Sequence, residues 1–114
     1  MPSSQNDIGL YANVLTERKQ EQINLADGLV HTLTPPTGLN GVAMIVVMEA
    51  QDGAFRYTAQ DGVTPTIATG MRVPEDGVLT WIPADLAVVK MIRDGADVGK
   101  INVAYYTFAR NTEV

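Results

Sequence analysis

Few side chains of this 114-residue chain are of the types that catalyse reactions or bind metal ions. The chain has one histidine, His31, and no cysteine. Neither a histidine-rich metal site nor a cysteine nucleophile can therefore be built within one chain. His31 stands between Val30 and Thr32, and no motif around it suggests a catalytic triad. We expect His31 to be a half-buried or surface residue of a strand.

The carboxylates could act in pairs, as in glycoside hydrolysis, or hold calcium through several oxygen atoms. Those that adjoin or lie near glycine are Asp52, Asp61, Asp76, Asp94 and Asp97. Asp-Gly suits tight hairpin turns, because glycine tolerates positive φ and aspartate caps its own turn. No stretch has the alternating Asp/Asn pattern of a calcium loop, and no glycine-rich loop is of the phosphate-binding kind. The sequence therefore predicts turns here, no catalytic or metal-binding residue, no cofactor and no enzyme activity.

Aromatic side chains are the remaining candidates for a binding surface, because they stack on sugars and anchor protein partners. The main ones are Trp81 and the consecutive pair Tyr105 and Tyr106. In a strand, one of two consecutive residues faces inward and the other outward. We expect Trp81 and one tyrosine in the core, and the outward tyrosine, Tyr106, as a candidate interface residue.

The net charge of −5 is spread along the chain, which argues against nucleic-acid binding and against docking on an anionic membrane. Residues 1–6 have neither a cationic start nor an apolar stretch, unlike a signal peptide. The longest apolar run, Val42–Met48, is far shorter than the ~20 residues of a membrane span. We expect a soluble protein that binds neither nucleic acid nor membrane.

From Gln20 onward, short alternating or apolar stretches are separated by Gly, Pro and Asp turns, as in all-β proteins. The predicted strands cover residues 22–25, 29–33, 42–49, 55–58, 71–73, 78–82, 86–93 and 99–108. Residues 42–49 should be buried on both faces or central in a sheet. Residues 86–93 could be a strand or a short helix, and Val88–Val89 favours a strand.

Alternation divides the last strand into two faces. Ile101, Val103 and Tyr105 share one face, and Asn102, Ala104 and Tyr106 share the other. About eight such strands close as an antiparallel β-sandwich or a jelly roll. We expect this sandwich to span residues 20–110, with a C-terminal tail at 111–114.

Residues 1–19 differ from the rest and are predicted to form an extended or short-helical N-terminal arm. Tyr11, Val14, Leu15 and Arg18 would share one face of a helix. The arm either lies on its own domain as a short amphipathic turn or packs on a neighbouring subunit. The second interpretation makes the apolar arm residues, together with Tyr106, the candidate interface: Ile8, Leu10, Tyr11, Val14 and Leu15.

Several motifs resemble, in their order, a family of small virion proteins of tailed bacteriophages. They are FRYTAQDGVTPT at 55–66, GMRVP at 70–74, Leu79, LAVVKMIR at 86–93 and INVAYY at 101–106. Upstream, LTPPTG at 33–38 followed by VAMI at 42–45 is also similar to that family. Each motif is a turn plus a strand, so the order carries the resemblance, and residues 1–19 lie outside it.

The resemblance implies a compact β-sandwich that decorates or cements a capsid after the shell has formed. It implies the outer capsid surface as the location and the major capsid protein as the partner. We also expect a homo-oligomer, with a trimer favoured over a dimer because shells offer local three-fold sites. A place in the neck or tail of the virion is an alternative.

A second resemblance covers about ten residues. Tyr57–Thr58, Asp61–Gly62 and Pro65–Thr66 are similar to a hairpin of the immunoglobulin-like domains appended to chitin-degrading enzymes. It raises the alternative of a carbohydrate-binding module on a virion, with Trp81, Tyr57 or Tyr106 as the stacking platform. The phage resemblance is preferred because it also accounts for the C-terminal strands.

Overall fold

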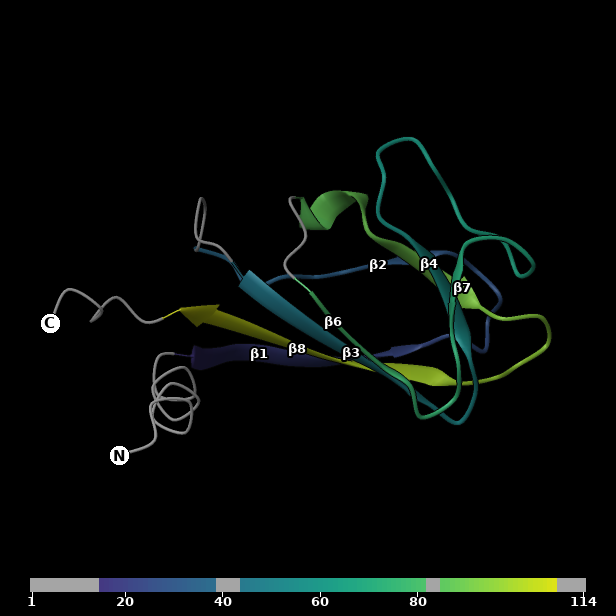
Figure 1. Cartoon of the computed structure of the whole chain (residues 1–114), viewed down its shortest axis with the longest axis horizontal. Coiled ribbons are helices and arrows are strands. Elements are labelled where there is room, and N and C mark those ends of the chain that lie inside the picture. The colour runs from purple at the N-terminus through teal and green to yellow at the C-terminus, as the bar shows by residue number, and fades with distance from the viewer. Residues whose placement is uncertain (1–14, 39–43, 82–84, 109–114) are drawn as a thin grey trace, which may run out of the picture.

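The alternating strands predicted from the sequence pair into two four-stranded antiparallel sheets in the computed structural model, which describes residues 15–38, 44–81 and 85–108 (Figure 1). Within these residues the strands are β1 (Leu15–Asn24), β2 (His31–Thr32), β3 (Met44–Gln51), β4 (Phe55–Thr58), β5 (Met71–Val73), β6 (Val78–Trp81), β7 (Lys90–Arg93) and β8 (Lys100–Phe108). A short 3₁₀ helix, η1 (Leu86–Val88), precedes β7. The predicted all-β sandwich is confirmed.

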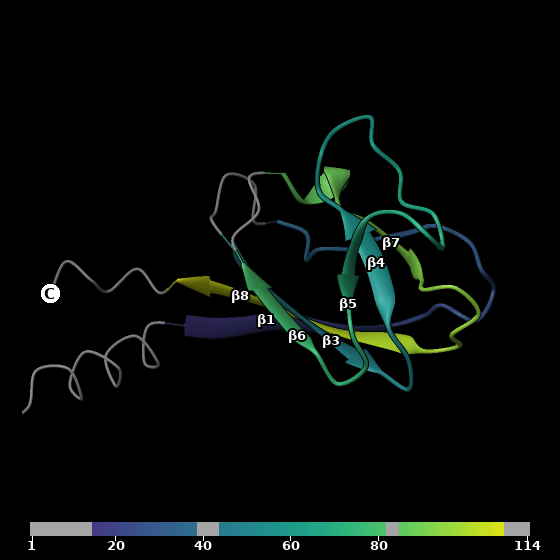
Figure 2. The same cartoon turned by 45° about the vertical axis from the view of Figure 1, so that its right-hand side comes forward.

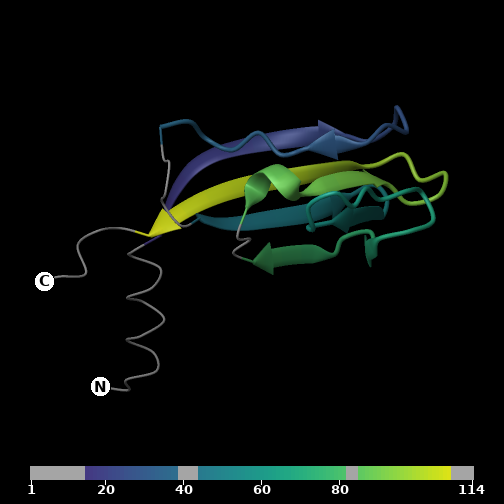
Figure 3. The same cartoon turned by 90° about the horizontal axis from the view of Figure 1, so that it is seen from above.

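The strands pair in a nested order that defines a jelly roll. β1 pairs with β8, β2 with β7, β3 with β6, and β4 with β5. Successive pairs alternate between sheet A, with the order β1-β8-β3-β6, and sheet B, with the order β2-β7-β4-β5. Figure 2 shows the two layers, and Figure 3 shows the purple, yellow, teal and green strands of sheet A lying in this order. This arrangement is the two-sheet jelly roll.

The core lies between the sheets and takes every second residue of the central strands. On β8, Ile101, Val103 and Tyr105 are buried, which is the inward face predicted for this strand. They pack with the buried side chain of Val89, at the end of η1, and with those of β3 and of sheet B: Val46, Met48, Ala50, Phe55 and Met91. Each such side chain contributes about 1.5–3 kcal/mol relative to exposure, so this layer holds the two sheets together.

The aspartate-containing turns lie where the sequence predicts them, but two differ in detail. At Gly62 and Gly95, glycine takes the positive φ, with values of 78° and 57°. At Asp52 and Asp76 the aspartate itself has a positive φ, of 65° and 66°. Aspartate tolerates this left-handed region because its short polar side chain bonds locally.

β1 crosses the boundary expected between arm and domain. It starts at Leu15, which pairs with Phe108, so residues 15–19 are part of sheet A. Leu15 and Arg18 are therefore in an extended strand rather than on one helix face, because pairing with β8 satisfies the backbone groups of the residues on either side of Arg18. The register shifts between Glu17 and Lys19, which leaves Arg18 without a paired residue.

Two other predicted elements are shorter. Of residues 29–33 only His31–Thr32 are in a strand. The segment 86–93 is a strand only from Lys90, because the Asp85 side chain accepts a 2.9 Å hydrogen bond from the backbone N–H of Ala87 and starts η1. β3 is a central strand, as predicted, and β4 and β5 have the predicted bounds.

Candidate functional site: the open face of sheet A

The outer face of sheet B is covered by the chain's own loop, residues 59–70. Pro65 in this loop is fully buried, and Ile92, on the outer side of β7, is only 6% exposed. The Thr58 hydroxyl donates to the Val63 carbonyl at 2.8 Å, and the Gly95 N–H donates to the Ile67 carbonyl at 2.8 Å. This loop therefore leaves little of sheet B's outer face for a partner.

A partly exposed cluster of ion pairs holds the loop to the sheet. The Asp94 carboxylate accepts hydrogen bonds of 2.7 Å from the Nε–H of Arg72 and from the Nε–H of Arg56. These two hydrogen bonds lower the pKa of Asp94, and the bond from Arg72 has the larger effect. Arg56 also donates to the Gly70 carbonyl at 3.0 Å, at the end of the loop. Arg56 and Asp94 therefore stabilise the fold.

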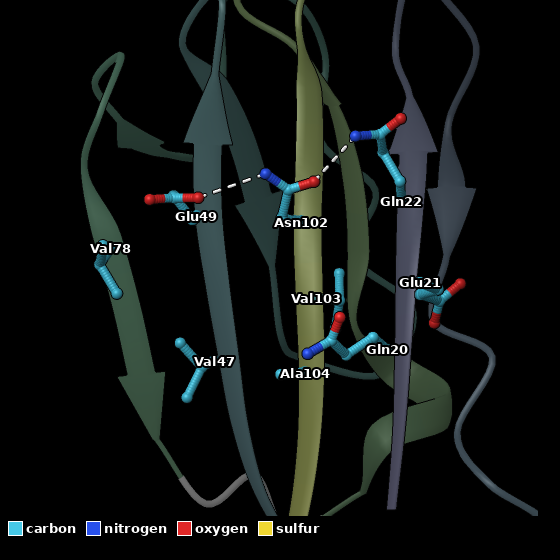
Figure 4. Close-up of a pocket in the computed structure, with 9 residues that line it drawn as sticks. All are labelled: Gln20, Glu21, Gln22, Val47, Glu49, Val78, Asn102, Val103 and Ala104. Atoms are coloured by element: carbon cyan, nitrogen blue, oxygen red, sulfur yellow. Dashed lines mark hydrogen bonds between the residues drawn. The ribbon is translucent and has the colours of Figure 1, made fainter. Parts of the chain in front are cut away.

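The outer face of sheet A carries a row of hydrogen-bonded polar side chains across three strands. The Gln22 Nε2–H of β1 donates to the Asn102 Oδ1 of β8 at 2.9 Å. The Asn102 Nδ2–H donates to Gln51 at 2.8 Å and to Glu49 at 3.2 Å, both on β3. We call these four side chains the amide row, and Figure 4 shows three of them lying in line across the sheet.

Beside the amide row lies an open depression of about 590 Å³ with an apolar floor. Val47 of β3 and Ala104 of β8 lie in the middle, and Val78 of β6, 58% exposed, borders it (Figure 4). Gln20 and three side chains of the amide row, Gln22, Glu49 and Asn102, supply its polar side. We call the amide row and this depression together the open face. It combines apolar contact area with hydrogen-bonding groups, as protein-binding surfaces do.

Tyr106 lies on the same outer side, further along β8. It pairs with Glu17 of β1 and Ile45 of β3, and its side chain is half-buried. Burial, and then the neighbouring Glu17 carboxylate, raise the pKa of Tyr106. The predicted outward tyrosine is therefore partly covered by its neighbours.

Tyr105, on the inner side, anchors β1 to the segment that follows β2. Its hydroxyl donates to Glu21, which also accepts a 3.0 Å bond from the Thr34 N–H. Lys19 donates to the Thr34 carbonyl at 2.6 Å. Burial, reinforced by the Glu21 carboxylate, raises the pKa of Tyr105 well above its usual range. Two of the four charged side chains of β1, Lys19 and Glu21, are thereby bound to the body of the protein.

The lone histidine is a partly exposed surface residue, as expected. The His31 Nε2 lies 2.9 Å from the Asp27 Oδ1, and the His31 side chain is 27% exposed. The hydrogen bond to His31 is the main cause of a lowered pKa at Asp27. Asp27 lies in the β1–β2 connection, and His31 is the first residue of β2.

Most of the predicted interface residues cannot be placed. Ile8, Leu10, Tyr11 and Val14 lie outside the described residues. Leu15 begins β1, but its side chain is also outside the description. The same holds for the side chain of Trp81, whose backbone pairs with Val46. Tyr106 is the predicted residue that the structure places, and it is next to the open face.

The principal residues of the open face, Gln22, Glu49 and Val47, were not predicted. Asn102 and Ala104 were assigned to the outward side of the last strand, but their neighbours depend on which strands pair with it. The alternation of each strand was readable in the sequence, whereas the register between distant strands was not. Polar and small residues at outward positions of two central strands were the available signal.

Among residues 15–38, 44–81 and 85–108, no group of His, Asp or Glu side chains could hold a metal ion. The same part of the chain contains no helix long and apolar enough to cross a membrane. Neither a family model, nor a curated protein, nor a solved structure matches this chain.

Proposed function

We propose that this protein is a bacteriophage virion structural protein that decorates the outside of the capsid and binds it through the open face of sheet A. The observation that supports the proposal is the contrast between the two outer faces. Residues 59–70 cover sheet B, whereas the depression on sheet A leaves Val78 58% exposed beside the amide row. The order of motifs from Phe55 to Tyr106 is what directs the proposal to a phage head.

Several motif residues of that resemblance have a part in the fold. Arg56 is bound to Asp94, Pro65 of the loop is buried, and Tyr105 is in the core. Two others, Asn102 and Ala104, line the open face. Proteins that share these motifs would share the scaffold, and the residues of the open face would determine which partner each of them binds.

The role would be mechanical. A protein contact of ordinary size buries about 1,600 Å² in total, and repetition over the shell multiplies its effect. Apolar area at Val47, Ala104 and Val78 would be removed from water across a joint between capsomers. Opening that joint under the pressure of packaged DNA would then cost more free energy.

Two exposed valines allow a matched test. Val78→Lys places a charge in the open face, and Val98→Lys places the same charge in the turn before β8, where the valine is 61% exposed. Co-sedimentation with heads of the encoding phage that lack the protein should show binding for the wild type and for Val98→Lys. Val78→Lys should lose at least roughly tenfold in affinity, because a buried unpaired charge is costly.

Equal binding by Val78→Lys and the wild type would contradict the open face as the contact. Absence of binding by the wild type to heads, necks and tails alike would contradict the virion role itself.

The carbohydrate alternative is less well supported. Tyr57, in sheet B, packs against the core and lies 6.4 Å from the ring of Phe55. Tyr106 is on the outer side of sheet A, so these two rings cannot stack on one sugar. A glycan array on the wild-type protein tests this alternative directly.

A further inference from the structure

We propose that β1 pairs antiparallel with β1 of a second copy, around a two-fold axis at Gln22, so that two A sheets form one continuous sheet. This inference concerns self-association and stands apart from the proposed virion role. It rests on three features: the free edge of β1, the direction in which its backbone N–H and C=O groups point, and the amide row.

β1 is a long edge strand. It has ten residues, whereas the other edge strands of the described sheets, β2, β5 and β6, have two, three and four. Long unprotected edges are the ones that pair with another chain. The irregularity between Glu17 and Lys19 is confined to one end, and the register with β8 is unbroken from Lys19 to Asn24.

The backbone hydrogen bond at the end of β1 determines which of its groups face outward. The Leu25 N–H donates to the Gly99 carbonyl of the β8 side at 3.0 Å. In an antiparallel pair every second residue bonds to the same neighbour. The backbone groups of Ile23 and Glu21 therefore face β8, and those of Gln20, Gln22 and Asn24 face the free edge. No hydrogen bond among the described residues uses them.

Two charged side chains near the proposed axis, Lys19 and Glu21, are not available to protect the edge of β1. Lysine on an edge strand discourages pairing when its ammonium group projects from the sheet. The Lys19 ammonium group is held by the Thr34 carbonyl at 2.6 Å, and the Glu21 carboxylate accepts bonds from Thr34 and Tyr105. These three bonds draw the two charged groups toward the inner side of the strand.

On the outer side of the sheet, the edge carries an amide side chain that does not use all of its hydrogen-bonding groups. Gln22 is exposed and uses its Nε2 to donate to Asn102, which leaves its Oε1 and a second N–H free of bonds to described residues. Across a two-fold axis at Gln22, this amide meets its own equivalent. Each Gln22 can then donate to the other, and the amide row runs from one copy into the next.

Charge and the irregularity at Arg18 together favour this register over its neighbours. Centring the axis at Gln22 places Gln20 opposite Asn24 and Glu21 opposite Ile23, with no like charges facing one another. Centring it at Glu21 would place that carboxylate directly opposite itself, which is unfavourable. Centring it at Gln20 would place the unpaired Arg18 opposite Gln22 and interrupt the ladder.

A residue on the axis faces itself, so introducing a charge of either sign at Gln22 tests the proposal. The wild type should sediment as a reversible dimer of 12.3 kDa chains as its concentration rises toward about 1 mM. Gln22→Lys and Gln22→Glu should each weaken the dimer at least roughly tenfold by self-repulsion. An equimolar mixture of the two variants should recover it as a heterodimer.

Thr80→Lys and Thr80→Glu are the matched controls, because Thr80 is also exposed on an edge strand of sheet A, β6. They should sediment like the wild type. Circular dichroism identifies any variant that fails to fold, and Gln22→Pro, which removes the outward N–H, then serves as a second disrupting variant. A wild type that stays monomeric at about 1 mM, or forms a trimer, overturns the proposal. So does a mixture that does not associate.

Discussion

At the scale of single residues, Tyr105 shows how a core side chain also fastens an edge. Its hydroxyl is the buried donor to Glu21, which in turn receives the Thr34 N–H. Tyr105→Phe keeps the ring but leaves Glu21 without this donor. We expect a loss of about 1–3 kcal/mol in the free energy of unfolding, measured by urea denaturation.

The raised pKa of Tyr105 also gives this variant a pH signature. The folded state favours the protonated phenol, so wild-type stability should fall as the pH rises above 10, where the unfolded tyrosine ionises. Tyr105→Phe should lose less stability over that range than the wild type. An identical decline in both proteins would mean that another group governs the alkaline transition.

Asp94 gives a prediction of the opposite sign. Because Arg72 and Arg56 lower its pKa below 3.8, the stability it contributes is present above that pH and is lost as the pH falls through the folded-state value. Asp94→Asn should lower the free energy of unfolding by about 1–2 kcal/mol at pH 7, since the cluster is partly exposed. The difference from the wild type should shrink below pH 3.8. Asp61→Asn, at an exposed turn residue, is the control and should leave the free energy of unfolding unchanged at pH 7 and at acidic pH.

At the scale of elements, the loop 59–70 depends on one glycine for its closure onto sheet B. Gly70 has a φ of +109°, and a Cβ atom there would lie 3.0 Å from the Tyr57 carbonyl oxygen and 3.2 Å from Pro65. Gly70→Ala should therefore cost about 2 kcal/mol or more. Gly62→Ala, with a φ of +78° and no atom within 4 Å of the added carbon, should cost only about 1 kcal/mol. Thermal unfolding of the two variants makes the comparison, and equal losses would contradict the close approach.

The elements that the sequence predicted best are those bounded by strong turns. Residues 55–58 and 71–73 match β4 and β5, because glycine, proline and aspartate limit them on both sides. Residues 29–33 and 86–88 were misjudged, since apolar and β-branched composition does not show whether a partner strand is available. Asp85 as a helix cap was the local signal that outweighed the Val88–Val89 pair.

The open face was only partly predictable for a related reason. The outward side of β8 followed from alternation, so Asn102, Ala104 and Tyr106 were assigned correctly to one face. Gln22 lies 80 residues earlier in the chain, and its bond to Asn102 depends on the β1–β8 register. Long-range register follows from the whole core rather than from either strand alone.

At the scale of the whole molecule, the two proposals concern one sheet and share the amide row, which is part of the open face and reaches the β1 edge at Gln22. A two-fold axis at Gln22 leaves the open faces of both copies on the same side of a continuous sheet. Two contacts would then engage one capsid surface together, which strengthens attachment without any new contact type. The dimer also differs from the trimer expected from sequence resemblance, because strand pairing of this kind closes with two copies.

The nested pairing of the strands has a consequence for the synthesis of the protein. β8 is synthesised after the other described strands, yet it lies between β1 and β3 and supplies Ile101, Val103 and Tyr105 to the core. β1 must therefore wait until β8 has been synthesised before it finds its only strand partner among the described residues. Until then the four-stranded sheet A cannot be completed, and both edges of β1 are open.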